Sequence, residues 1–318
     1  AHHLTGGIEI ASIGELNLVA GGNSEKYINN PSADKKFLRA AVASRSTIII
    51  DNLAQLTSLI EFVGKRPLKP ILLRLNSCVL KQFNPEIKKI RADQFGMDWD
   101  TACQAIDFCK SHNTPLAGFH LFNGSYQFTS NAVETAIAAK SIIEAIETRY
   151  QQALSFINLG GGFSENWQHS DFDFGTYKQL LASFPEHITL AHETGRGLMA
   201  SAGYFATRVR YLKDIEHQQY AICDGGMNQN FLLAQTENSF RKFKTPMIFS
   251  PAPHSKLKSC TFVGSSCSKD DVIGKQDEHH ITPQVGDICI FDNCGAYNAS
   301  YTLSPFLKLP SAKTYIIE

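Results

Sequence analysis

Three consecutive glycines, Gly160, Gly161 and Gly162, follow an apolar segment near the middle of the chain. Glycine has no Cβ, so the backbone N–H groups of such a loop can approach an anion closely. The glycines come directly after a predicted strand, residues 156–159. The pattern indicates a phosphate site at the end of that strand, although a plain tight turn would also use these residues.

The next predicted strand, 188–191, ends in a loop that carries charges of both signs. Glu193 supplies a carboxylate, Gly195 gives a second flexible joint, and Arg196 supplies a guanidinium that can clamp a phosphate. A simple surface pair of Glu193 with Arg196 is the alternative. The triple glycine one strand earlier favours the anion site.

An earlier predicted strand, 116–122, carries two rings. Strand alternation places His120 and Phe122 on one face, where a ring could stack on a flat cofactor. A hydrogen-bonded core histidine is the alternative for His120. In the second half of the chain, two glycine-flanked loops carry Cys267 and Tyr297. A thiol beside carboxylates is a candidate proton donor, and a buried structural cysteine is the alternative.

Alternating strands and helices must position these residues. The first part of the chain predicts strands at 8–11, 47–50, 71–75, 116–122, 156–159 and 188–191, with helices at 100–111 and 132–150 among them. This alternation predicts parallel βα units, and the missing dinucleotide fingerprint favours a barrel over a doubly wound sheet.

After residue 202 the pattern changes to strands alone. Strands are predicted at 204–212, 219–223, 247–249, 260–263, 287–291 and 313–317, separated by Pro, Gly, Ser and Asn turns. The sequence therefore predicts an α/β barrel domain over residues 1–202 and a mostly antiparallel β domain over residues 203–318.

Composition excludes several other classes of protein. Lysine plus arginine and aspartate plus glutamate number 30 each, so no net charge steers nucleic acid, and the basic stretch 241–244 is interpreted as solvated surface. The eight cysteines form no CxxC pair or zinc-spaced cluster, so no metal site is predicted and reduced thiols indicate a cytoplasmic protein. No apolar run approaches the ~20 residues of a membrane span, and no signal peptide is visible.

The motifs occur in an order that resembles the fold-type III decarboxylases of pyridoxal 5'-phosphate (PLP), the family of diaminopimelate, ornithine and arginine decarboxylases. The resemblance covers nearly the whole chain. The segments that carry it are 8–16 ("D-V-A-S-x-G-E-L"), 73–75 with Arg74, 118–125 ("G-x-H-x-H-x-G-S"), 160–163 ("G-G-G-F"), 193–196 ("E-P-G-R"), 224–228 ("D-A-G-M-N"), 264–271 ("G-P-x-C-E-S-x-D") and 295–297 ("G-A-Y").

This resemblance implies a (β/α)8 barrel, whose first strand is missing from this chain, followed by a β domain. It also implies a homodimer with shared active sites. The residues implied at the phosphate and the cofactor are Gly160, Gly161, Gly162, Gly195, Arg196, Ser125, Tyr297, Arg74, His120 and Phe122. Glu193 would pair with the pyridine nitrogen, Cys267 from the other subunit would protonate the product, and Ser268 and Asp271 would face the substrate.

Four departures from the family pattern modify these expectations. The family's Schiff-base lysine precedes the segment 8–16, and no lysine precedes Ile8 here, so we expect a further segment to supply it. Phe122 replaces a stacking histidine, and Thr194 replaces a proline. Ser268 replaces the acidic residue that meets a distal ammonium, which argues against free ornithine or lysine as substrate.

The substrate class is therefore expected to be an amino acid or a derivative, free or tethered to a carrier protein. The motifs around Phe122, 224–227 and 304–307 resemble the branch of the family that accompanies carrier-protein and exopolysaccharide clusters. Two alternatives stay open: a decarboxylase-like binding or regulatory protein without the lysine, and a racemase on the same barrel. The cysteine loop favours decarboxylation over racemisation.

Overall fold

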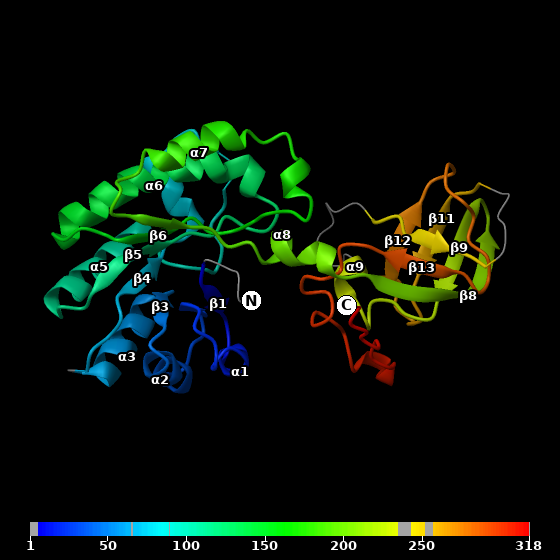
Figure 1. Ribbon diagram of the computed structural model, residues 1–318, viewed down its shortest axis with the longest axis horizontal. Helices are drawn as coiled ribbons and strands as arrows, with labels where there is room; N and C mark the ends of the chain where they lie inside the picture. Colours follow the sequence, from blue (N-terminus) through cyan, green and yellow to red (C-terminus); the bar gives the residue numbers. More distant parts are fainter. Residues whose placement is uncertain (1–5, 65, 89, 235–242, 252–256, 318) are drawn as a thin grey trace. The chain divides into compact units, whose positions relative to one another are not determined.

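The computed structural model describes residues 6–317, apart from residues 65, 89, 235–242 and 252–256 (Figure 1). The chain divides into two compact units, Ala1–Thr194 and Gly195–Glu318. The domain boundary that we predicted between residues 202 and 203 stays a prediction.

The first unit is built on a curled sheet of seven parallel strands that follow one another in chain order. They are β1 (Ile8–Ile10), β2 (Lys26–Asn29), β3 (Thr47–Ile50), β4 (Ile71–Arg74), β5 (Leu116–His120), β6 (Phe156–Asn158) and β7 (Thr189–Ala191). Every residue of β3, β4 and β5 is buried, as expected for parallel strands that are covered on both faces. The predicted partial α/β barrel is confirmed.

Helices connect these strands: α1 (Ile13–Leu18), α2 (Lys35–Ala43), α3 (Leu53–Val63), α4 (Leu80–Phe83), α5 (Trp99–Ser111), α6 (Phe128–Tyr150) and α7 (Phe174–Ala182). Side chains of Asp or Asn accept an N–H in the first turn of α2, α3, α5 and α7, the usual way of satisfying the free donors there. The long helix α6 differs, because Gln127 precedes it without a side-chain cap and no acid lies in its first turn. No acidic side chain in the first turn therefore neutralises the positive end of the α6 dipole.

The second unit contains a six-stranded, mostly antiparallel sheet in the order β10-β13-β8-β9-β11-β12. Its strands are β8 (Phe205–Ile215), β9 (Gln218–Cys223), β10 (Met247–Phe249), β11 (Cys260–Val263), β12 (Val272–Gln276) and β13 (Ile288–Phe291). The short helices α8 (Gly195–Met199) and α9 (Phe231–Ala234) accompany it. Among the described strands of this unit, β9 and β11 alone pair in parallel, so the predicted mostly antiparallel β domain is confirmed.

Three strand predictions were wrong. The strands β2 and β12 were missed, because each has few apolar residues in sequence and is recognised only by its ladder partners. The predicted strand 313–317 is not formed, and Tyr315, Ile316 and Ile317 are almost fully exposed there. β-branched residues favour a strand, but a strand also needs a partner.

The basic stretch 241–244 is described only in part, and the helices bear on whether the chain could span a membrane. Arg241 and Lys242 of the basic stretch lie outside the described residues, while Lys244 donates to the backbone oxygen of Asp292 at 2.8 Å. Among the described helices, none is long and apolar enough to cross a membrane.

Candidate active site

Every strand of the first unit places one polar side chain near its carboxyl end. We call this set the polar row: Glu9, Asn29, Asp51, Arg74, His120, Asn158 and Glu193. The carboxyl ends of parallel strands meet at one edge, where barrel enzymes build their sites. Hydrogen bonds and close contacts link neighbouring members, so the row is a connected network rather than a set of isolated polar groups.

Glu193 forms one end of the polar row. Its Oε1 accepts hydrogen bonds from His120 Nε2 and from Asn158 Nδ2, both at 2.8 Å. His120 is fully buried, and this burial lowers its pKa to about 4. The imidazole is therefore neutral at pH 7 and donates from Nε2, which orients the Glu193 carboxylate without cancelling its charge.

Glu9 lies on the first strand and meets Glu193 beyond the last one. Ligand atoms of Glu9, His120 and Glu193 all lie within 4.8 Å of one another, which shows how far the sheet curls. Partial burial and the Glu193 carboxylate raise the pKa of Glu9 to about 8. The Glu9 side chain is also exposed, so solvent moderates this rise, and a pKa raised toward 8 means that Glu9 holds its proton more tightly than an ordinary carboxyl.

Arg74, on the fourth of the seven strands, organises the middle of the polar row. It is 6% exposed, and its Nη1 donates to Asn29 Oδ1 and to Asp51 Oδ1, each at 3.2 Å. Asn29 in turn donates to Glu9 Oε1 at 2.9 Å, which joins Arg74 to the carboxyl groups of Glu9 and Glu193. The buried guanidinium is thus paired and hydrogen-bonded, the condition under which a buried charge is tolerated. Its predicted place beside the cofactor stays a prediction.

The glycine loop after β6 provides a cradle for an anion. Gly160 and Gly162 have φ values of +76° and +94°, and a Cβ on them would lie 2.1 Å from Leu121 O and 2.6 Å from Gly124 O. The N–H groups of Gly161 and Gly162 donate to no acceptor within the described chain. Gly162 O accepts from Phe128 N at 3.2 Å, which holds the loop against the uncapped start of α6. These features fit a phosphate group.

The residues that follow β5 lie beside this cradle in space and vary in exposure. Phe122 is half-buried two residues beyond the end of the strand, and Ser125 is exposed before α6. Their predicted roles, ring stacking and phosphate binding, stay predictions.

In the second unit, Arg196 and Tyr297 lie together. The Arg196 Cζ atom is 5.3 Å from the centroid of the Tyr297 ring, and the Tyr297 hydroxyl packs against Gly195. The pair presents a guanidinium and a phenol hydroxyl, both donors that suit a phosphate.

The cysteine loop of the second unit is anchored by Asp271. This residue is 2% exposed, and its carboxylate accepts from Met227 N at 2.7 Å and from Ser266 N at 3.0 Å. Cys267 is exposed at the tip, and Ser268 is half-buried with its Oγ accepting from Asp270 N at 3.2 Å. Asp271 therefore positions the loop that presents the thiol, while its predicted contact with substrate stays a prediction.

Glu9, His120 and Glu193 together could also approach a divalent cation, since each offers a ligand atom. His120 Nε2 already donates to Glu193, however, so the same atoms are used in a hydrogen bond. The prediction that no metal is bound stays a prediction.

Four members of the polar row were not predicted as site residues: Glu9, Asn29, Asp51 and Asn158. A sequence signal existed, because each lies at or next to the carboxyl end of an apolar strand. A polar residue at such a position has to be hydrogen-bonded when it is buried.

We expect stability to fall with rising pH because of Glu9. A carboxyl whose pKa is raised from 4.5 to about 8 on folding binds its proton more tightly in the folded state, so stability is lost as pH rises through this range. Glu9→Gln keeps a donor toward Glu193 but cannot ionise, so its unfolding midpoint should depend less on pH. Denaturant unfolding between pH 5 and 9 tests this, and an unchanged pH profile in the variant would contradict it.

Comparison with known proteins supports a family assignment. The chain is 28% identical over 326 residues to L-glutamyl-[BtrI acyl-carrier protein] decarboxylase from Niallia circulans, covering 96% of this chain and 76% of that protein. It is 26% identical to diaminopimelate decarboxylase from Vibrio cholerae, covering 99% of this chain and 78% of that protein. A Staphylococcus aureus relative, 2-[(L-alanin-3-ylcarbamoyl)methyl]-2-hydroxybutanedioate decarboxylase, is 27% identical over 96% of this chain and 80% of its own length.

Solved structures share the fold. The lysine/ornithine decarboxylase of Vibrio vulnificus superimposes with a TM-score of 0.77 at 22% identity, over 97% of this chain and 81% of that one. The arginine decarboxylase of Paramecium bursaria Chlorella virus gives a TM-score of 0.80 at 16% identity, over 96% of this chain and 82% of that one.

A family model described as "Pyridoxal-dependent decarboxylase, C-terminal sheet domain" matches residues 32–295, most of the chain. Together with the relatives, this match confirms the resemblance noted in the sequence, and the chain belongs to the pyridoxal-dependent decarboxylases, the family of diaminopimelate and ornithine decarboxylases.

Proposed function

We propose that the protein catalyses the PLP-dependent decarboxylation of an amino acid or amino-acid derivative. The observation that carries this proposal is the pairing, in one unit, of a glycine cradle at an uncapped helix start with a carboxylate oriented by a neutral histidine. When bound, PLP supplies an electron sink for the electron pair that remains after CO2 leaves.

The chain's own residues would serve this chemistry in two ways. The N–H groups of Gly161 and Gly162 would hold the phosphate, helped by the positive end of the α6 dipole. Glu193 would face the pyridine nitrogen, where its negative charge favours the protonated ring. His120 and Asn158 would act by fixing the Glu193 carboxylate in one orientation.

A substrate tethered to a carrier protein is the finer form of this proposal. Ser268 cannot neutralise a distal ammonium group, and a buried ammonium without a counter-charge is costly. One of the relatives named above is a decarboxylase of a glutamyl group on an acyl-carrier protein. We also propose a homodimer in which Cys267 of one subunit completes the site of the other, because an exposed thiol at the tip of an anchored loop is available to a partner.

The proposal is tested with the full-length protein. We expect a visible absorbance band from bound PLP and release of CO2 from carrier-bound L-glutamate or a related derivative. The panel should include free ornithine, lysine, arginine, diaminopimelate and glutamate. Efficient turnover of free ornithine or lysine would refute the tethered-substrate form, and a protein without PLP binding would favour the non-catalytic binding protein instead.

Arg196→Ala should weaken PLP binding by about 1.5–3 kcal/mol, the range for a hydrogen bond to a charged group. The reason is that Arg196, stacked on Tyr297, is proposed as a further phosphate ligand. Titration of the apoprotein with PLP measures the affinity. Arg210→Ala, which removes an exposed arginine from β8, is the matched control. Equal affinities in both variants would exclude Arg196 from the phosphate site.

A further inference from the structure

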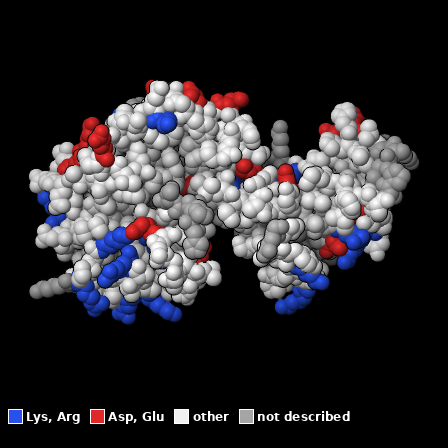
Figure 2. Space-filling view, in the orientation of Figure 1, with Lys and Arg blue, Asp and Glu red and all other residues white. Residues whose placement is uncertain are grey.

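Basic side chains gather on the outer face of α2 and beside the end of α3. We define the Phe62 patch as Lys35, Lys36, Arg39, Arg45, Phe62 and Arg66. The five cations are exposed, whereas Phe37, Leu38 and Ala41 on the other face of α2 are buried. Figure 2 shows lysine and arginine side chains concentrated over this part of the first unit.

Two arginines of the patch are held by an aromatic ring. The Cζ atoms of Arg39 and Arg66 each lie 5.1 Å from the centroid of the Phe62 ring. Stacking on an aromatic face restrains a guanidinium while its N–H donors stay free. Within the described part of the chain, no carboxylate pairs with either arginine. The patch therefore presents two positioned and uncompensated positive charges.

The local charge is out of balance with the rest of the chain. Residues 26–69 contain eight basic and three acidic residues, a surplus of five positive charges in a chain whose net charge is zero. Two of the three acids are engaged: Asp51 binds Arg74 inside the barrel, and Asp34 caps α2. Charge gathered on one face attracts a partner of opposite sign and sets its orientation.

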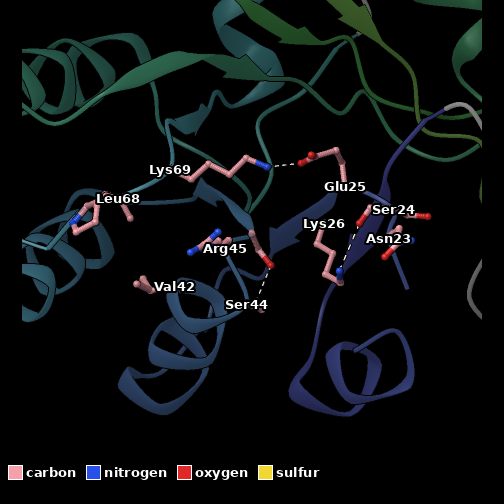
Figure 3. A pocket seen from close by; sticks show the side chains of 11 residues that line it. Asn23, Ser24, Glu25, Lys26, Val42, Ser44, Arg45, Leu68 and Lys69 are labelled. Atoms are coloured by element: carbon pink, nitrogen blue, oxygen red, sulfur yellow. Dashed lines mark hydrogen bonds and ion pairs between the residues drawn. The ribbon is translucent and has the colours of Figure 1, made fainter. Parts of the chain in front are cut away.

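A hollow of about 570 Å³ borders the patch at the amino-terminal ends of β2, β3 and β4 (Figure 3). Its two lysines are already engaged: Lys69 pairs with Glu25, and Lys26 donates to Gly22 O and Ser24 O. Arg45 is the cation of this hollow that faces solvent without such a pair among the described residues. Most of the uncompensated charge therefore lies on the α2 and α3 flank, and Arg45 belongs both to the patch and to the wall of the hollow.

The patch begins at the same end of the first unit as the polar row. Helix α2 follows β2, whose last residue Asn29 belongs to the row, and Lys35 and Lys36 form the first turn of the helix. Nine residues of helix span about 14 Å, so the patch runs from the mouth of the barrel at Lys35 and Lys36 toward the amino-terminal ends of the strands at Arg45 and Arg66. A protein docked along this flank could extend a flexible, substrate-bearing arm from the Lys35 end of the patch over the rim of the barrel.

We propose that the Phe62 patch is the docking surface for an acidic carrier protein that bears the substrate. This inference rests on the proposed function, because it assumes a tethered substrate. The alternative of nucleic acid is disfavoured, since the patch is confined to one flank of a protein with no net positive charge.

The test compares two variants with a matched control in the full-length PLP-loaded protein. Lys35→Glu/Lys36→Glu leaves the Phe62 stack intact, and Arg39→Glu/Arg66→Glu removes it. Lys178→Glu/Lys213→Glu changes the same number of exposed charges elsewhere. Each protein is assayed with L-glutamyl-BtrI acyl-carrier protein and with L-glutamyl-pantetheine, at low and high salt.

For both patch variants we expect KM for the carrier substrate to rise about tenfold or more, with kcat and the kinetics on the pantetheine substrate unchanged. The salt dependence of kcat/KM for the carrier should also flatten. The control should behave as the unmodified protein. Equal losses on both substrates, or no change on the carrier, would overturn the proposal.

Failure of the proposed function is recognised separately. If the unmodified protein turns over neither substrate, the tethered-glutamate reaction is wrong, and binding alone decides the docking surface. In a titration with the BtrI carrier protein, patch-dependent binding would support the surface, and absence of binding would refute it.

Discussion

Replacing Cys267 by alanine is expected to slow formation of the correct product by about 10²–10⁴-fold, the usual contribution of a positioned general acid. The thiol is exposed at the tip of a loop that Asp271 anchors by hydrogen bonds, so removal of the thiol should not disturb the fold. PLP affinity should be unchanged. Substrate should still lose CO2, but part of it should appear as an aldehyde in place of the amine, because Cys267 would no longer direct the proton to the substrate carbon. Amine, aldehyde and CO2 measured in the same reaction test this.

Cys78→Ala, which removes a partly exposed thiol of the first unit, is the control and should retain activity. A Cys267→Ala protein that forms amine at the unmodified rate and yield would remove Cys267 from the mechanism.

Cys267 also provides a test of the proposed dimer. In a heterodimer of a Cys267→Ala subunit with a Glu193→Ala subunit, one hybrid site keeps both residues if the loop crosses the interface. An equal mixture should then regain about a quarter of the unmodified activity after random pairing. Verified heterodimers without activity would show that the site is not shared in this way.

The second large effect concerns Glu193. Glu193→Gln should lower kcat by about 10²–10³-fold, the range for losing one preorganised electrostatic contact in a closed site. The amide oxygen can still accept from His120 and Asn158, so the local geometry should survive while the negative charge is lost. PLP affinity should change little, because the phosphate contacts remain. Single-turnover CO2 release and PLP titration separate the two effects.

The matched control is Glu9→Gln, which removes a neighbouring carboxyl that already carries a proton near neutral pH. It should leave kcat near the unmodified value. Full activity in Glu193→Gln would show that the ring nitrogen needs no carboxylate partner in this protein.

Sequence patterns predicted a strand correctly where the residues of that strand are enough to specify it. The strands β3, β10 and β11 were predicted at their observed bounds, because short apolar runs between turn residues specify a buried strand. The weak strands β2 and β12 were missed and the exposed segment 313–317 was overpredicted, because the decisive factor in each case is the neighbouring strand.

In the candidate site, too, some features follow from the sequence alone and others only from the tertiary structure. By itself, the sequence determined the family and the order of its motifs, since residue types and spacing carry that information, and it predicted roles for Gly161, Glu193 and Cys267. Only the tertiary structure decided which polar groups meet. Glu9 and Glu193 lie 184 positions apart in the chain and contact each other because the sheet curls. The neutrality of His120 likewise depends on burial, and the anchoring role of Asp271 depends on Met227, 44 positions away, which no local pattern encodes.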